Sequence, residues 1–135
     1  MFRSVASVIL LSVCSVAALT AAAWAQSAFP YEQEMVLDAR PMPGGKRVPM
    51  IEVMPDGRAQ VDLWCKSGPA LVTIVDDTIV VTLGPMPEVQ CPPARAQADE
   101  QMVAALSQAT QWRAEGDALV LVGPDATLRF RTSSH

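Results

Sequence analysis

Beyond an apolar N-terminal segment, short runs of hydrophobic residues alternate with polar turns along most of the chain. From Arg58 to Cys65 apolar and polar residues alternate, which is the two-residue period of a half-buried β-strand. Pro, Gly, Asp and Ser separate this run from others of similar length. The pattern predicts strands at residues 35–39, 48–54, 58–65, 70–75, 78–83, 119–122 and 127–131, with a further strand beginning at Trp112.

Three turns follow from the residues between these runs. Pro55-Asp56-Gly57 combines a fixed φ, a side chain that can bond its own backbone, and a glycine that accepts positive φ. Asp76-Asp77 joins two runs rich in Val, Ile and Thr, which predicts a hairpin with a solvated turn. Ser67-Gly68-Pro69 is expected to interrupt the strands before it.

One segment has the period of a helix. Pro92 and Pro93 suit the first helical positions, and residues 94–111 contain good helix formers. The stripe expected to be buried recurs at three- and four-residue steps and contains Ala98, Met102, Ala105, Leu106 and Ala109. Asp99 and Glu100 are expected to be solvated charges near the helix start, as is Glu88 before it. These elements predict an α+β fold, a mostly antiparallel β-sheet with one main α-helix packed against it.

The apolar N-terminal segment resembles an export signal. Arg3 precedes an apolar run from Val5 to Thr20, and Ala23-Trp24-Ala25 fits the small-x-small pattern of a cleavage site. We therefore expect residues 1–25 to be a signal peptide, cleaved after Ala25, and the mature protein to be periplasmic or secreted and not membrane-spanning. The alternative is a retained membrane anchor, because the run approaches the length that spans a bilayer. Residues 26–33 are expected to form a flexible leader, residues 34–131 the domain, and residues 132–135 a tail.

Length and charge narrow the classes of function. A chain of 135 residues accommodates one domain. After removal of the leader, 14 acidic and nine basic residues remain, a net charge of −5. This balance gives no basic surface for a phosphate backbone, so we expect no nucleic-acid partner.

Export also determines how the cysteines are interpreted. Cys65 and Cys91 are the two that follow the leader, an even number in an oxidising compartment, which predicts a disulfide. A redox pair of the Cys-x-x-Cys type requires closer spacing, and a zinc site requires about four ligands. A structural disulfide between Cys65 and Cys91 is therefore the preferred interpretation.

The sequence contains no set of residues typical of an active site. The one histidine is His135 at the C-terminus, where the geometry of a general base is hard to maintain. We predict a protein that is not an enzyme, with no catalytic residue and no cofactor. A less favoured alternative is a copper site built from thioethers, because four methionines lie in or beside proline-containing loops: Met42, Met50, Met54 and Met86. Methionine also fills irregular gaps under loops, which is the simpler interpretation.

A contact surface is predicted around Trp64 and Lys66. Strand alternation places Trp64 on the face opposite Val61 and Leu63, where an aromatic ring beside a charge suits a protein contact. The alternative is that Trp64 packs beneath a loop, because tryptophan is highly buried on average.

Several segments together resemble the META domain family over residues 34–131. The resemblance lies in Gln90-Cys91-Pro92-Pro93 before the helix, in Gly116-Asp117-Ala118-Leu119-Val120-Leu121 after it, and in the terminal Leu128-Arg129-Phe130. Where the family has Gly-Cys-Asn, this chain has Trp64-Cys65-Lys66. The resemblance implies a compact α+β fold, an envelope location, an association with stress tolerance, an envelope protein or component as partner, and no established catalytic activity.

Overall fold

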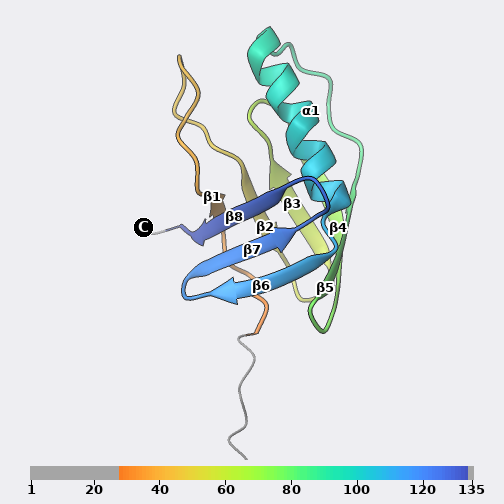
Figure 1. Cartoon of the computed structure of the whole chain (residues 1–135). Helices are drawn as coiled ribbons and strands as arrows, with labels where there is room; N and C mark the ends of the chain where they lie inside the picture. Colours follow the sequence, from red (N-terminus) through yellow and green to blue (C-terminus); the bar gives the residue numbers. More distant parts are fainter. Residues whose placement is uncertain (1–27, 134–135) are drawn as a thin grey trace, which may run out of the picture.

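Strands and one helix follow each other simply along the part of the chain that the computed structural model describes, residues 28–133 (Figure 1). The helix α1 lies between the fifth and sixth strands in the sequence. The elements are β1 (Met35–Leu37), β2 (Met50–Val53), β3 (Arg58–Asp62), β4 (Ser67–Val75), β5 (Thr78–Leu83), α1 (Pro93–Gln108), β6 (Gln111–Glu115), β7 (Ala118–Val122) and β8 (Thr127–Thr132).

The strands close into an antiparallel barrel. Each strand pairs with the next, and β8 pairs with β1, for example at Leu37 and Phe130. The predicted α+β fold with a mostly antiparallel sheet is confirmed, and closure of the sheet is an additional finding. Eight strands leave an interior that side chains can fill, so the barrel encloses a packed core.

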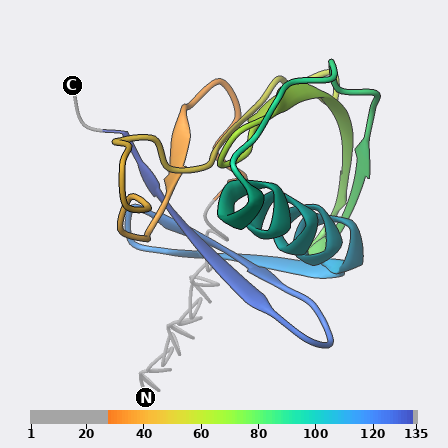
Figure 2. The ribbon, with the colours of Figure 1, turned by 90° about the horizontal axis from the view of Figure 1, so that it is seen from above.

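The barrel is weakest between β5 and β6, and the helix lies at this point. These two strands pair at one position, Thr78 with Gln111. Viewed from above, α1 lies between the strands β4 and β5 on one side and β6 to β8 on the other (Figure 2). The helix thus covers the place where the hydrogen-bonded wall is thinnest.

The core lies where alternating inward residues of the strands meet one face of the helix. Phe130 and Leu106 are fully buried, the first from β8 and the second from α1. The helical stripe is confirmed at Met102 and Leu106, and Ala109 is buried just beyond the helix end. The other buried members of the cluster are Phe29, Met35, Ile51, Val53, Ala59, Val61, Leu63, Ala70, Val72, Ile79, Val81, Leu119 and Leu121.

The prediction that Ser67-Gly68-Pro69 interrupts the strands was wrong. These residues begin β4, and they pair with Asp62, Val61 and Gln60 of β3. Gly68 is buried, and a Cβ there would lie 2.7 Å from Cγ of Met86. The glycine is therefore needed for close packing inside a strand, whereas the sequence suggested a turn.

The helix ends three residues earlier than predicted, at Gln108. Ala109 adopts an extended backbone, and the amide of Thr110 donates to the carbonyl of Val122. Gln111 then pairs with Val122 as the first residue of β6. Pairing with β7 takes over from the helical hydrogen bonds at this point, although the residues themselves favour a helix.

Within the segment predicted as a flexible leader, residues 26–33, Phe29 and Tyr31 pack against the core. The ring of Phe29 is buried and lies 4.9 Å from that of Tyr31 and 5.2 Å from that of Trp112, measured between ring centroids. The Trp112 indole also donates from Nε1 to the carbonyl of Asp76 over 2.8 Å. The aromatic residues therefore fix the start of the described chain against the barrel.

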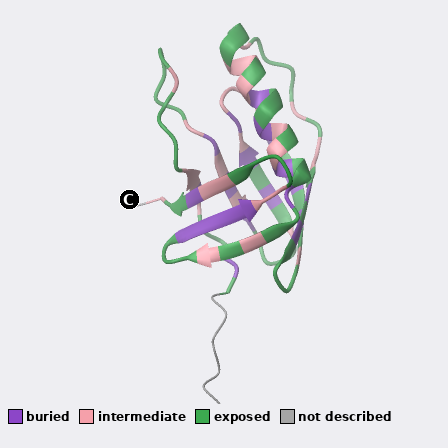
Figure 3. Ribbon diagram, viewed as in Figure 1, coloured by how far each residue is buried: buried purple, intermediate pink, exposed green. Residues whose placement is uncertain are grey.

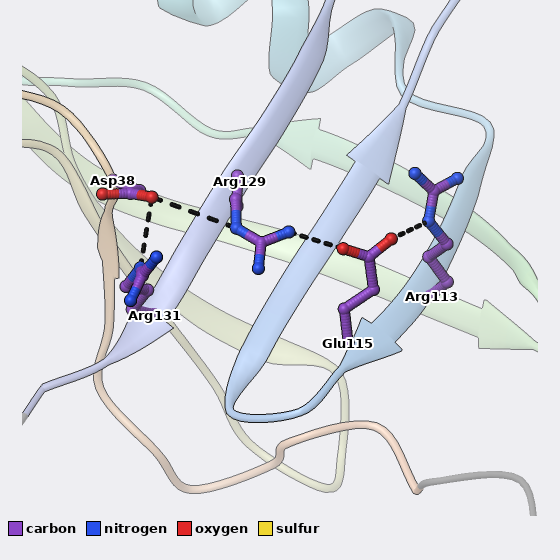
Figure 4. Close-up of polar contacts among 5 residues, drawn as sticks. All are labelled: Asp38, Arg113, Glu115, Arg129 and Arg131. Atoms are coloured by element: carbon purple, nitrogen blue, oxygen red, sulfur yellow. Dashed lines mark hydrogen bonds and ion pairs between the residues drawn. The ribbon is translucent and has the colours of Figure 1, made fainter.

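An ion-pair ladder covers the outer face of β6, β7 and β8 (Figure 4). Arg129 pairs with both Glu115 and Asp38, while Arg113 pairs with Glu115 and Arg131 with Asp38. Hydrogen bonds from Arg129 and then from Arg113 hold the pKa of Glu115 below its ordinary value. Opposite charges thus link strands that are separated in sequence.

The same ladder explains why β7 is buried on both faces (Figure 3). Val120 points outward but is 2% exposed, and its partners in the two neighbouring strands are Arg113 and Arg129. Arginine side chains cover apolar surface with their aliphatic stems while their guanidinium groups stay in water. The ladder therefore acts as an outer cover for this strand.

Candidate functional site

The turn between β3 and β4, residues 63–66, is fixed by polar groups of both charges. Arg47 donates from Nε to the carbonyl of Leu63 over 2.8 Å and from Nη2 to the carbonyl of Lys66 over 2.9 Å. On the amide side, Asp99 of α1 accepts from the backbone N–H of Cys65 at 3.1 Å and of Lys66 at 2.9 Å. Both kinds of backbone group in the turn are thus satisfied by charged side chains.

The burial of Asp99 corrects the expectation that it is a solvated charge. Its exposure is 4%, and both carboxylate oxygens are used by the turn. Buried carboxylates are tolerated when hydrogen bonds replace the lost water, as the two amides do here. Asp99 also continues the buried stripe of Met102 and Leu106 at steps of three and four, a spacing that could have revealed its burial.

A disulfide joins the same turn to the segment before the helix. Cys65 and Cys91 are bonded, with their Cα atoms 6.1 Å apart, which confirms the predicted bridge. Cys91 lies two residues before the first residue of α1. The disulfide and Asp99 together attach the N-terminal half of the helix to the β3–β4 turn.

A cavity of about 530 Å³ lies beside this attachment, bounded by the helix, the turn and the end of β5. The helix lines it with Ala96, Asp99, Glu100 and Val103, which share one face because they are three, four and seven residues apart. The turn contributes Leu63 and Lys66, and the end of β5 and the loop after it contribute Leu83, Gly84 and Met86. The size and the mainly apolar lining are typical of sites for small ligands.

The charged side chains that line the cavity carry more negative than positive charge. Lys66 supplies a positive charge, and its Nζ lies 3.9 Å from Glu88, an exposed residue of the loop before α1. Glu100 lines the cavity and takes part in no ion pair among residues 28–133. Among the charged lining residues, Lys66 is positive and Asp99 and Glu100 are negative, and the β3–β4 turn already uses the carboxylate of Asp99.

The two residues of the predicted contact surface lie next to this cavity, but only one of them lines it. Lys66 is a lining residue, and its side chain is 32% exposed. Trp64 is half-buried, between the exposed position that the contact surface needs and the packed position of the alternative. Its role in contacts stays a prediction. Sequence reasoning did not bring Arg47, Glu100 and Met86 together at this site, because their proximity depends on the closed barrel.

The cysteines and Asp99 also bring three residues of metal-ligand types close together. One oxygen of Asp99 and the two sulfur atoms lie within 4.8 Å of one another. In the disulfide, however, neither sulfur is a thiolate, which is the form that binds metals. The oxidised site is therefore a structural attachment.

The four methionines of the copper alternative differ in their surroundings. Met50 begins β2 and Met54 follows its end, so the strand rise places them about 13 Å apart along the chain direction, too far to share one ion. Met86 packs against the core and lines the cavity, and Met42 is half-buried in the loop after β1. The packing of Met86 fits the gap-filling interpretation.

A second surface of note is the outer face of β4 and β5. Leu71, Val75 and Val80 are each 59% exposed there. Exposed apolar groups of this kind can mark contacts, but strands in water also carry them singly. None of these three residues lines the cavity beside α1.

We expect Asp99→Asn to lower the free energy of unfolding by about 1.5–3 kcal/mol, the usual range for hydrogen bonds to a charged group. The amide retains one acceptor oxygen, so one backbone N–H of the turn loses its partner. Thermal or urea unfolding of the oxidised protein measures the loss. Glu100→Gln is the matched control, because it removes the same charge from the next, exposed residue; equal stability of the two variants would contradict the role given to Asp99.

Together, the fold and this site define a small antiparallel α+β barrel in which one helix is attached over an apolar cavity. The chain belongs to the META domain family, whose model matches residues 17–135. The family that the sequence resembled is thus confirmed. No protein among those with curated descriptions matches the sequence.

Solved structures with similar folds are distant in sequence. The NMR structure of a protein from Burkholderia xenovorans has a TM-score of 0.64 at 16% identity, covering 78% of this chain and 84% of that one. The crystal structure of a DUF4847 family protein from Bacteroides vulgatus has a TM-score of 0.53 at 13% identity. That match covers 64% of this chain and 60% of the other, so this chain spans about 60% of that relative's length. At these identities the likeness shows the fold alone.

The predicted signal peptide, residues 1–25, lies outside the described residues. Within residues 28–133, no helix has the length and apolar character needed to cross a membrane.

Proposed function

We propose that this META domain protein is a non-enzymatic, exported envelope protein that acts by binding an apolar ligand or segment in the cavity beside α1. The observation that carries the proposal is the cavity itself, about 530 Å³ with a mainly apolar lining. A site of this size and composition suits binding, in which apolar contacts supply affinity and a few polar groups supply orientation.

The state of the reactive groups supports a binding role. Chemistry at this site would call on the thiols and the buried carboxylate, but the thiols are joined in a disulfide and both oxygens of Asp99 accept backbone hydrogen bonds. Each group therefore has a structural role that keeps the cavity wall in place. A part in stress tolerance, as the resemblance to the family implied, is included in the proposal.

Export is supported by two features of the sequence. The apolar run before Ala23-Trp24-Ala25 has the form of a signal peptide. The Cys65–Cys91 bridge suits an oxidising compartment, where disulfides persist. Fractionation of cells that express the full chain, with mass spectrometry of the N-terminus, tests this part: we expect periplasmic or secreted material that begins at Gln26, and cytoplasmic material that retains residue 1 would refute it.

A neutral apolar dye tests the cavity. We expect Nile red to bind the oxidised mature protein with increased fluorescence, and Ala96→Leu to abolish most of that signal, because the larger side chain enters the cavity. Ala104→Leu is the matched control, since Ala104 is exposed on the same helix and does not line the cavity. Equal dye binding by the two variants would place the dye elsewhere, for example on the face with Leu71 and Val80, and would refute the proposal.

A further inference from the structure

The charges beside the cavity narrow the class of ligand beyond an apolar one. Besides apolar side chains, the lining contains Lys66, Asp99 and Glu100, and of these three Glu100 is the exposed one. Charged groups beside an apolar site rarely add much affinity, but they discriminate between ligands of opposite charge. The sign of the unpaired charge therefore predicts the charge of the ligand.

The ammonium group of Lys66 is already opposed by a carboxylate. Its Nζ lies 3.9 Å from Glu88, and Asp99 approaches the same residue at the backbone amide. An anionic ligand at Lys66 would have to compete with Glu88 and would meet Glu100 as well. The surroundings of Lys66 thus disfavour an anion.

Glu100 is available to a ligand. Its side chain is exposed, it lines the cavity, and it follows Asp99, whose own charge is used by the β3–β4 turn. A positive group beside Glu100 would meet a carboxylate that no ion pair within residues 28–133 occupies, while its apolar part lay against Leu83 and Val103. The net negative charge of the chain acts in the same direction over a longer range.

We infer that the cavity beside α1 binds a hydrophobic organic cation, with its apolar part inside and its positive group beside Glu100. The inference rests on the proposed function, because it assigns a charge to the ligand of the same cavity. Met86 suits such a ligand, since an unbranched thioether adapts its shape to irregular apolar groups.

Two probes of equal chain length and opposite charge test the inference. Isothermal titration calorimetry of the oxidised mature protein would compare decyltrimethylammonium with decanoate, each below its micelle-forming concentration. We expect the cation to bind more tightly than the anion, and Ala96→Leu to weaken the cation strongly. Glu100→Gln should weaken binding of the cation by about two- to fivefold, the range for one exposed charge pair.

Charge variants supply the controls. Lys66→Met should strengthen binding of the cation, because it removes the one positive charge from the lining. Asp125→Asn removes a carboxylate from the turn between β7 and β8, outside the cavity, and should leave binding unchanged. It therefore separates the local effect of Glu100 from the effect of net charge.

Failure of the inference and failure of the proposed function give different results. If Nile red binds in the cavity but decanoate binds as tightly as the cation, or Glu100→Gln has no effect, the inference is overturned and the cavity remains a binding site. If Ala96→Leu affects neither the dye nor the cation, the proposed function fails, and the inference fails with it.

Discussion

Phe130→Ala is expected to lower the free energy of unfolding by about 3–5 kcal/mol, the usual range for removing a buried aromatic ring. Phe130 is fully buried in β8, and it pairs with Leu37 of β1 and Leu119 of β7. It thus lies where the barrel closes, so the cavity left by alanine would weaken the contact between the first and last strands. The loss is a large part of the stability of a small domain. Urea unfolding of the oxidised mature protein measures it.

Two leucine variants serve as controls for this prediction. Leu119→Ala, at a buried position of β7, should cost about 2–5 kcal/mol. Leu71→Ala, at a position that is 59% exposed on β4, should change stability by at most about 0.5 kcal/mol. A Phe130→Ala protein as stable as the Leu71→Ala protein would mean that the register of β8 is wrong.

Trp112→Ala is expected to lower the free energy of unfolding less than Phe130→Ala does. It is half-buried, its ring lies against that of Phe29, and its Nε1 donates to the carbonyl of Asp76. Large-to-small substitutions cost most where the site is fully enclosed. Trp112 and Phe130 therefore differ in how completely the barrel encloses them.

Removal of the Cys65–Cys91 disulfide is expected to cost about 3–4 kcal/mol, the chain-entropy estimate for the loop that it closes. The cysteines are 26 residues apart, and the bridge attaches the segment before α1 to the β3–β4 turn. The double variant Cys65→Ser, Cys91→Ser should therefore unfold at lower temperature and bind Nile red less well, because the cavity wall loses one of its attachments. Calorimetry and dye titration measure the two effects.

Chemical reduction of the unchanged protein provides the control. The reduced protein should match the double serine variant in unfolding temperature, whereas the same reductant should leave the variant unchanged. Alkylation of the untreated mature protein should add no label to either cysteine. If the untreated protein takes up two labels, the bridge is absent from the exported form.

Local patterns were enough to predict most of the elements. The Val- and Thr-rich arms around Asp76-Asp77 are confirmed as the β4–β5 hairpin, and the three- and four-residue steps of Met102 and Leu106 as α1. The alternation predicted over residues 58–65 is confirmed as β3 up to Asp62, after which the chain turns. Each of these signals depends on neighbours in the sequence, because the period of the side chains reports the local backbone. The disulfide was also predictable, since the leader leaves two cysteines.

Contacts between distant segments decided what the patterns could not. Gly68 and Pro69 looked like a turn, but pairing with β3 and close packing against Met86 place them in a strand. Asp99 looked like a solvated charge, but the turn 34 residues earlier supplies two amides that make its burial favourable. Closure of the sheet through β1 and β8 was not visible in any segment.

The candidate site is also decided by contacts between distant segments. The sequence determined the strands, the helix, the bridge and the family resemblance, because these follow from local periodicity, residue type and the order of motifs. Only the tertiary structure brought Lys66, Glu100 and Met86 to one cavity, because each lies on a different segment and their meeting depends on how the barrel closes beside α1. The charge of the cavity lining depends on the same contacts, since Lys66 comes from the β3–β4 turn and Glu100 from α1.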